Sequence, residues 1–135
     1  MALQLSVAAR NARLDAFETV TGGTAVLKIR TGAQPANCGA ADTGSALATC
    51  NLPADWMAAA NAGTKGLSGS WTDGSVDASG TPGHFRLYAN DASTCHLQGT
   101  VSAAGGGGDL IVDSMVWTAG QAFTVSLFTL TDANA

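Results

Sequence analysis

The sequence predicts a mainly β protein, an antiparallel jelly-roll-like β-sandwich with one N-terminal α-helix. After residue 23 the apolar residues alternate with polar ones, which is typical of strands with one buried face. Seven or eight such segments follow at regular spacing, separated by glycine-rich turns. Residues 6–21 instead have the period of a helix. An immunoglobulin-like sandwich is the alternative, because the pattern separates these two architectures poorly.

The length and composition indicate one domain, with residues 1–22 as a helical arm and residues 23–135 as the sandwich. Of the 135 residues, 46% are hydrophobic but only 12% are charged. That charged share is about half of the usual one, which suggests surface patches covered by a partner. The net charge is −4 and the basic residues are dispersed. Nucleic acid and anionic membranes are therefore not expected partners.

The N-terminal helix has its own start and stop signals. Ser6 is a suitable N-cap, and Gly22 and Gly23 end the helical pattern. One narrow apolar stripe runs along it, and this stripe must be covered by the chain's own sheet or by a neighbouring chain. We expect an interface with apolar residues at its centre and arginines at its rim, formed by Leu3, Val7, Arg10, Arg13, Leu14 and Phe17.

The opening stretch does not have the pattern of a signal peptide. Its arginines follow a short apolar start, and the stretch "RNARLDAFE" interrupts any apolar run. No run approaches the roughly 20 apolar residues of a membrane span. We therefore expect a protein made in the cytoplasm and not secreted.

The β segments are separated by glycine, proline and asparagine breakers. The stretch "TAVLKIRTG" alternates clearly, and the stretch at 54–66 is read as a short helical turn or irregular loop. The predicted strands are residues 24–32, 45–52, 67–75, 83–91, 93–102, 109–117 and 122–131.

Two details of the C-terminal half are specific enough to test. The glycine-rich stretch 103–108 predicts a hairpin between its two flanking strands. The last strand is expected to place Phe123, Val125 and Leu127 on one face and Phe128 and Leu130 on the other. Such a strand is central in the sheet or covered at an interface.

Signals for catalysis are weak, and we do not expect an enzyme. His84 and His96 lie on the more polar faces of their predicted strands, and the sequence has no G-x-S-x-G nucleophile motif. Exposed or hydrogen-bonded structural histidines are the simpler interpretation. The odd count of three cysteines, with no metal-binding spacing, indicates reduced structural thiols at Cys38, Cys50 and Cys95.

Two further patterns suggest binding, and each has a simpler interpretation. Asp73 and Asp77 resemble part of a calcium loop but lack its alternating ligands and closing glutamate, so they are expected to cap turns. Trp56, Trp71 and Trp117 form either a sugar-stacking platform or anchors in a core or interface, and the anchors are favoured. No cofactor and no metal are expected.

The opening "MALQLSVAARNARLDAFET", running into "TAVLKIRTG", resembles the start of small virion structural proteins of tailed bacteriophages. That family typically opens with M-A-L-x-L-S, followed by A-x-R-N-A-x-L-D-A and a strand containing L-K-I. The likeness continues more loosely through "GHFRLY" and "FTVSLFTLT". The opening motif is its specific part, because the remainder is a general β pattern.

The resemblance implies a non-enzymatic capsid decoration, or cement, protein with a jelly-roll-like fold. Such a protein binds the lattice of the major capsid protein, stabilises the head and assembles with itself as a dimer or trimer. The implied location is the capsid surface of the virion. The alternative is a tail or fibre component that binds a receptor or glycan. A small hydrolase is a third interpretation, which would require a polar cleft around a histidine.

Overall fold

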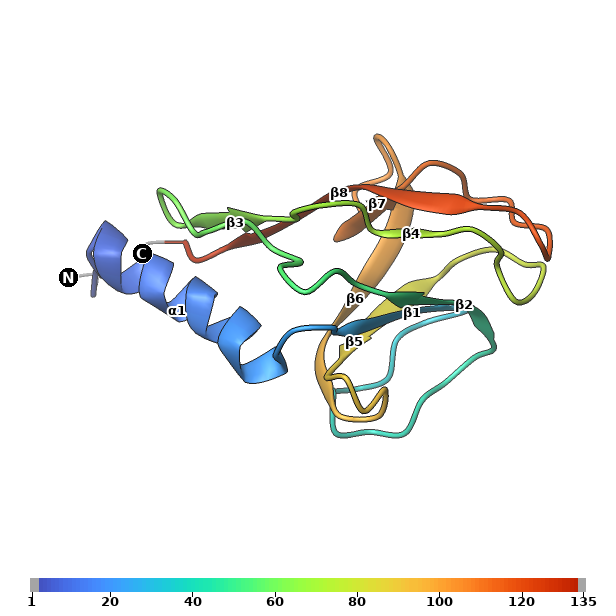
Figure 1. Ribbon diagram of the computed structural model, residues 1–135, viewed down its shortest axis with the longest axis horizontal. Coiled ribbons are helices and arrows are strands. Elements are labelled where there is room, and N and C mark those ends of the chain that lie inside the picture. The colour runs from blue at the N-terminus through green and yellow to red at the C-terminus, as the bar shows by residue number, and fades with distance from the viewer. Residues whose placement is uncertain (1–2, 134–135) are drawn as a thin grey trace.

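The computed structural model describes residues 3–133, which contain one helix and eight strands (Figure 1). The outermost residues of both predicted ranges, 1–2 and 134–135, lie outside this description. The helix α1 spans Val7–Thr21. The strands are β1 (Val26–Arg30), β2 (Ala46–Asn51), β3 (Thr64–Gly66), β4 (Thr72–Asp73), β5 (His84–Tyr88), β6 (Cys95–Ala103), β7 (Leu110–Val112) and β8 (Phe123–Thr131).

All eight strands belong to one open sheet, which confirms a mainly β protein with one N-terminal helix. The strand order is β2-β1-β5-β6-β7-β8-β3, and β4 pairs with β8 beside this path. Every pair is antiparallel except β6 with β7, which is parallel. The purely antiparallel pairing predicted from the sequence is therefore wrong at this one place.

The sheet curls so that β2, at one end of its strand order, comes close to β4, which pairs with β8. Cys50 of β2 donates its thiol to the carbonyl of Thr72 in β4, and the amide of Asp77 donates to the carbonyl of Leu47 in β2. In Figure 1, β4, β7 and β8 lie over β1, β2 and β5, and β6 passes between the two groups. Apolar side chains fill the space between these groups and form one core.

A line of aromatic rings crosses this core and reaches the helix. Trp56, Trp71, Phe128 and Phe85 follow one another with ring centroids 5.8, 5.3 and 5.7 Å apart. Phe17 of α1 continues the line, with its ring edge on Trp56 at 5.7 Å. Such contacts contribute about 0.5–1.5 kcal/mol each beyond the burial of the rings. The core therefore extends beyond the sheet to the underside of the helix.

The hairpin expected around the glycine-rich stretch is absent, because β7 runs parallel to β6. Val101 pairs with Leu110, and Ala103 pairs with Val112. Parallel neighbours usually need a crossover of about a dozen residues or more, yet residues 104–109 suffice here. A Cβ on Gly108 would lie only 2.7 Å from the backbone nitrogen of Ser102. Glycine thus lets the connection fold back directly against β6.

The expected facing of β8 is correct in its first half and wrong in its second. Phe123 and Val125 are buried as predicted, but Leu127 is 56% exposed and Phe128 is buried on the core side. The pairing with β7 shifts between these two halves, since Ile111 pairs with Leu127 and the next residue pairs with Val125. One extra residue in a strand exchanges its two faces. This irregularity turns Phe128 into the aromatic line.

The long segment between β1 and β2 is held against the sheet by two arginines, Arg30 and the more deeply buried Arg86. Arg86 of β5, only 2% exposed, donates to the carbonyls of Cys38 and Ala40 at 2.7 and 3.1 Å and pairs with the Asp42 carboxylate. The hydroxyl of Tyr88 also donates to Asp42 at 2.5 Å. Burial would raise the pKa of Asp42, but these hydrogen bonds outweigh it and lower that pKa.

Candidate interaction surface

The helix α1 forms where the sequence predicts it. The backbone amide of Ala9 donates to the Ser6 hydroxyl at 3.1 Å, so Ser6 is the N-cap. Gly22 ends the helix at φ 84°, and its amide donates to the carbonyl of Glu18. This left-handed conformation suits glycine, which has no Cβ to clash.

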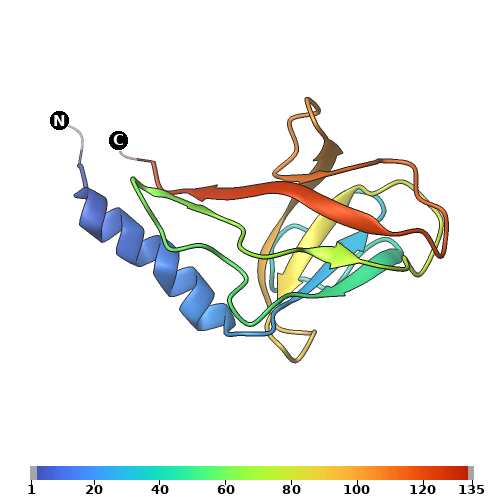
Figure 2. The same cartoon turned by 45° about the horizontal axis from the view of Figure 1, so that its top comes forward.

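The inner face of α1 lies against the chain's own structure (Figure 2). Leu14 is buried, and Phe17 packs on the Trp56 ring. The Arg10 guanidinium donates to the carbonyl of Asp132, just after β8, at 3.1 Å. Asn11 accepts a hydrogen bond from the amide of Gly63, just before β3, at 2.9 Å. The helix is thus attached along its length to β3 and the end of β8.

A buried lysine links the helix to the sheet. Lys65 of β3 is 2% exposed, and its ammonium lies 2.7 Å from Asp15 Oδ1 and 2.9 Å from Glu18 Oε2. It also donates to the carbonyl of Ala58 at 2.8 Å. Burial opposes its charge, but the hydrogen bonds to both carboxylates outweigh this and raise the pKa of Lys65. The hydrogen bonds from Lys65 and then from the Ala60 amide lower the pKa of Asp15.

These shifts predict an acid-sensitive link between helix and sheet. A lowered carboxyl pKa stabilises the fold above its usual range, and this stabilisation is lost as pH falls through the lowered pKa. The raised pKa of Lys65 stabilises the fold at pH values below the usual lysine pKa. This stabilisation is lost only as the pH rises through the raised pKa. In urea unfolding at pH 7 and pH 3, we expect the wild type to lose more stability on acidification than Lys65→Met does.

Lys28→Met is the matched control for this experiment. The Lys28 ammonium donates to the carbonyl of Ala92 at 3.0 Å, and no ion pair joins it to a carboxylate in residues 3–133. Its pH profile should match that of the wild type. An acid-induced loss in Lys65→Met as large as that of the wild type would contradict the assignment.

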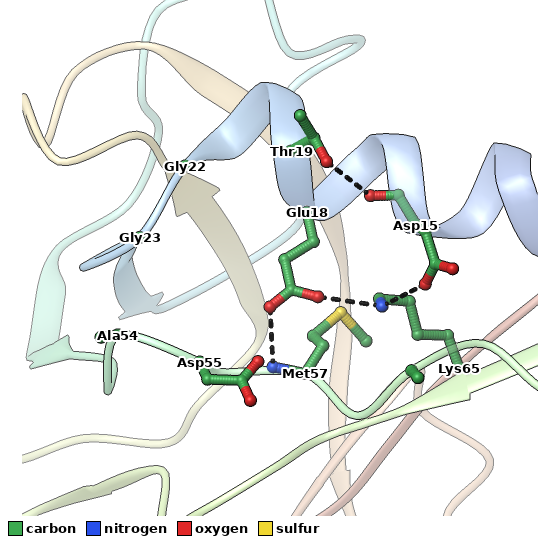
Figure 3. Close-up of a pocket in the computed structure, with 10 residues that line it drawn as sticks. Asp15, Glu18, Thr19, Gly22, Gly23, Ala54, Asp55, Met57 and Lys65 are labelled. Atoms are coloured by element: carbon green, nitrogen blue, oxygen red, sulfur yellow. Dashed lines mark hydrogen bonds and ion pairs between the residues drawn. The ribbon is translucent and has the colours of Figure 1, made fainter.

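A hollow of about 500 Å³ opens beside this ion pair (Figure 3). Its walls are the last turn of α1, the segment before β3 and Lys65 itself. Glu18 points across it and accepts a hydrogen bond from the amide of Met57 at 3.4 Å. The lysine charge at its wall is already engaged by Asp15 and Glu18. The hollow is thus mainly the seam along which the helix joins the body.

The outer face of α1 points away from the sheet. Its members, which we call the outer helix face, are Ala8, Ala12, Ala16, Thr19 and Val20; none of these five is charged, and the exposed Arg13 borders them. All five are exposed, Val20 at 66%. At the start of the helix, Leu3 and Val7 are exposed at 86% and 48%. A group of exposed apolar residues on one element is typical of a surface that binds a partner rather than of a surface that faces only solvent.

The six residues expected to form one interface are divided by the structure. Leu14 and Phe17 face the chain's own core, and Arg10 is bound to the carbonyl of Asp132. Arg13 lies at the edge, its side chain 64% exposed and 3.2 Å from the Asp132 carboxylate. Leu3 and Val7 remain open. The stripe is therefore a contact within the chain at its centre, and an exposed surface only at its start.

The sequence interpretation missed Lys65 and the outer helix face. A signal for the lysine was present, because Asp15 and Glu18 stand three residues apart on one side of the helix and can share one basic partner. The outer helix face consists mainly of alanines. In a sequence, alanines indicate a helix but do not indicate a binding surface.

The histidines, aspartates and tryptophans have structural positions. The ring of His84 is fully buried, with Nδ1 2.9 Å from the carbonyl of Gly32, and His96 is half-buried. Asp73 accepts a hydrogen bond from the amide of Ser75 and so caps a turn. Asp77 is exposed in the loop that follows. All three tryptophans are buried and therefore present no stacking platform: Trp56, Trp71 and Trp117.

The part of the chain that the structure describes contains neither a candidate metal site nor a helix that could span a membrane. Within residues 3–133, no cluster of three or more histidine, cysteine, aspartate or glutamate side chains is placed to hold a metal ion. In the same part of the chain, α1 is too short and too polar to cross a membrane. Comparison with protein-family models, curated proteins and solved structures gave no match.

Proposed function

We propose that this protein is a non-enzymatic structural component of a tailed-bacteriophage virion, and most specifically a capsid decoration protein. In this proposal it binds the lattice of the major capsid protein on the capsid surface, assembles with copies of itself and stabilises the head. The outer helix face makes the main contact, and Leu3 and Val7, which are exposed on the stripe side at the start of the helix, make a separate one. The curled sheet is the body that carries this helix, and in this proposal it takes the place of the jelly-roll-like fold that the resemblance implies.

The observation that carries the proposal is how the phage-like motif A-x-R-N-A-x-L-D-A divides between the two sides of α1. Its arginine, asparagine, leucine and aspartate are the residues that attach the helix to the chain's own structure. Its three alanines, Ala8, Ala12 and Ala16, are all exposed on the outer helix face. The motif therefore specifies a helix fixed to its body and presenting a smooth, uncharged outer surface.

The small, uncharged side chains of the outer helix face suit close packing against another protein. Alanines at every fourth position let a neighbouring surface approach the helix backbone closely, and no charge on this row has to be desolvated. The centres of protein interfaces are depleted in charge in the same way. The fixed attachment of α1 lowers the entropy lost on binding, because the surface is ordered before the partner arrives.

The test places charge on the outer helix face without disturbing the fold. Ala12→Glu with Ala16→Glu keeps good helix formers at exposed positions, so circular dichroism should be unchanged. We expect this double variant to lose co-sedimentation with phage heads that lack the protein, because two carboxylates would have to be buried at the contact. Leu3→Ser with Val7→Ser should weaken co-sedimentation in the same direction.

Val116→Glu is the matched control. Val116 is 78% exposed and lies between β7 and β8, in a connection outside the helix. This variant should bind heads as well as the wild type does. Full decoration by the Ala12→Glu/Ala16→Glu protein would exclude α1 as the contact, and failure of the wild type to bind any head would contradict the capsid assignment.

A further inference from the structure

Two of the three cysteines meet on the outer face of the sheet, far apart in the sequence. Cys95 begins β6 and pairs across the strands with Tyr88 of β5. Directly opposite residues of an antiparallel pair project to the same side. Arg86 lies two residues before Tyr88 and therefore shares that side. The sheet thus presents Cys95, Tyr88 and Arg86 together.

The segment between β1 and β2 brings Cys38 onto this group. The Arg86 guanidinium donates to the carbonyl of Cys38 itself at 2.7 Å. On one side, the Gln98 side chain donates to the carbonyl of Pro35 at 2.7 Å, and on the other, Tyr88 binds Asp42. Contacts before, at and after Cys38 therefore hold it over the start of β6, close enough to Cys95 for that thiol to influence the pKa of Cys38.

We propose that Cys38 and Cys95 are a redox-modification site that closes an intrachain disulfide, fastening the segment between β1 and β2 to β6. This inference is independent of the proposed function. Both side chains are half-buried, so a small oxidant reaches them. Cys50 is buried and donates its thiol to the carbonyl of Thr72, and it stays outside the reaction.

The oxidant in this proposal is a low-molecular-weight disulfide. A thiolate of the pair attacks it and forms a mixed disulfide, releasing one small thiol. The second protein thiolate then attacks the mixed disulfide, forms the Cys38–Cys95 bond and releases the second small thiol. Two protein thiols are oxidised to one disulfide, and one small disulfide is reduced to two thiols.

The surroundings of the pair set the rate of this exchange. Burial first, and then the neighbouring Cys95 thiol, raise the pKa of Cys38 to about 11. The reactive thiolate is therefore scarce at neutral pH, and the exchange accelerates as the solution becomes more alkaline. The closed disulfide constrains the unfolded chain and stabilises the fold.

The experiment incubates the full purified chain with oxidised glutathione and then counts free thiols by alkylation and mass spectrometry. We expect two thiols to disappear, a Cys38–Cys95 linked peptide to form, and Cys50 to stay alkylatable. The melting temperature should rise by several degrees and return when the disulfide is reduced. Cys50→Ala should still form the link, whereas Cys38→Ser and Cys95→Ser should not, and their melting should not respond to the oxidant.

Three results would overturn the proposal. One is three free thiols after prolonged incubation at pH 9. Another is glutathione attached separately to Cys38 and Cys95 with no linked peptide, which would mean that the two sulfurs cannot reach bonding geometry. The third is a Cys38 link to a second copy of the chain.

Discussion

Replacing Arg86 by methionine is expected to lower the free energy of unfolding by about 3 kcal/mol, the scale found when one partner of a buried ion pair is removed. Arg86 is 2% exposed, and its guanidinium donates hydrogen bonds to the carboxylate of Asp42 and to the carbonyls of Cys38 and Ala40. Methionine fills a similar volume but donates no hydrogen bond. The segment between β1 and β2 would therefore lose its most deeply buried attachment to the sheet, while Arg30 still binds the carbonyls of Thr43 and Gly44.

Chemical denaturation measures this loss, and limited proteolysis locates it. Cleavage should appear first within residues 31–45, while the remaining strands stay protected. Arg13→Met is the matched control, because the Arg13 side chain is 64% exposed in its ion pair with Asp132 and such surface pairs contribute about 1 kcal/mol or less. Equal losses in the two variants would show that Arg86 is no anchor.

Trp56→Ala is expected to cost about 4 kcal/mol, within the range measured when a large buried aromatic residue is truncated. Trp56 is fully buried between Phe17 and Trp71. Its indole N–H donates to the carbonyl of Gly22 at the end of α1 at 2.9 Å, and its own carbonyl accepts from the indole of Trp71. The truncation therefore opens a cavity and releases the end of the helix together.

Trp56→Phe separates these two effects. Phenylalanine retains most of the ring volume and loses only the hydrogen bond to Gly22, which is about 1 kcal/mol by itself. Hydrogen exchange should then show faster opening in the last turn of α1 with little change in β1 and β5. A Trp56→Ala protein with wild-type stability and wild-type exchange in α1 would contradict the assignment of this residue as the joint between helix and core.

Local sequence patterns were enough to predict the elements that are determined by interactions between neighbouring residues. The hydroxyl of Ser6 and the glycine at position 22 define both ends of the helix, and both act within one turn of it. Strict alternation around Leu27 and Ile29 identified β1 and its buried face. The same locality explains the correct interpretation of Asp73 as a turn cap, since its partner is two residues away.

Features that depend on contacts between distant residues could not be predicted from local sequence patterns. The sequence indicated that the stripe on α1 needs a cover, but it could not show that Leu14 is buried within the chain or that Trp56 covers Phe17. The glycines at 105–108 suit a hairpin and a parallel return equally well, and only the structure shows that β7 runs parallel to β6, with Gly108 close against Ser102. The facing of Leu127 and Phe128 depended on a shift in pairing with β7.

The sequence by itself determined the mainly β class, the single helix with its ends, and the low charge that favours contact with other proteins. These follow from periodicity, capping and composition, which short stretches of chain carry. Only the tertiary structure decided which side of the helix stays open, where Arg86 and Lys65 find their carboxylates, and that Cys38 meets Cys95. Each of these depends on residues brought together across tens of positions, and such contacts are fixed by the packing of the whole chain.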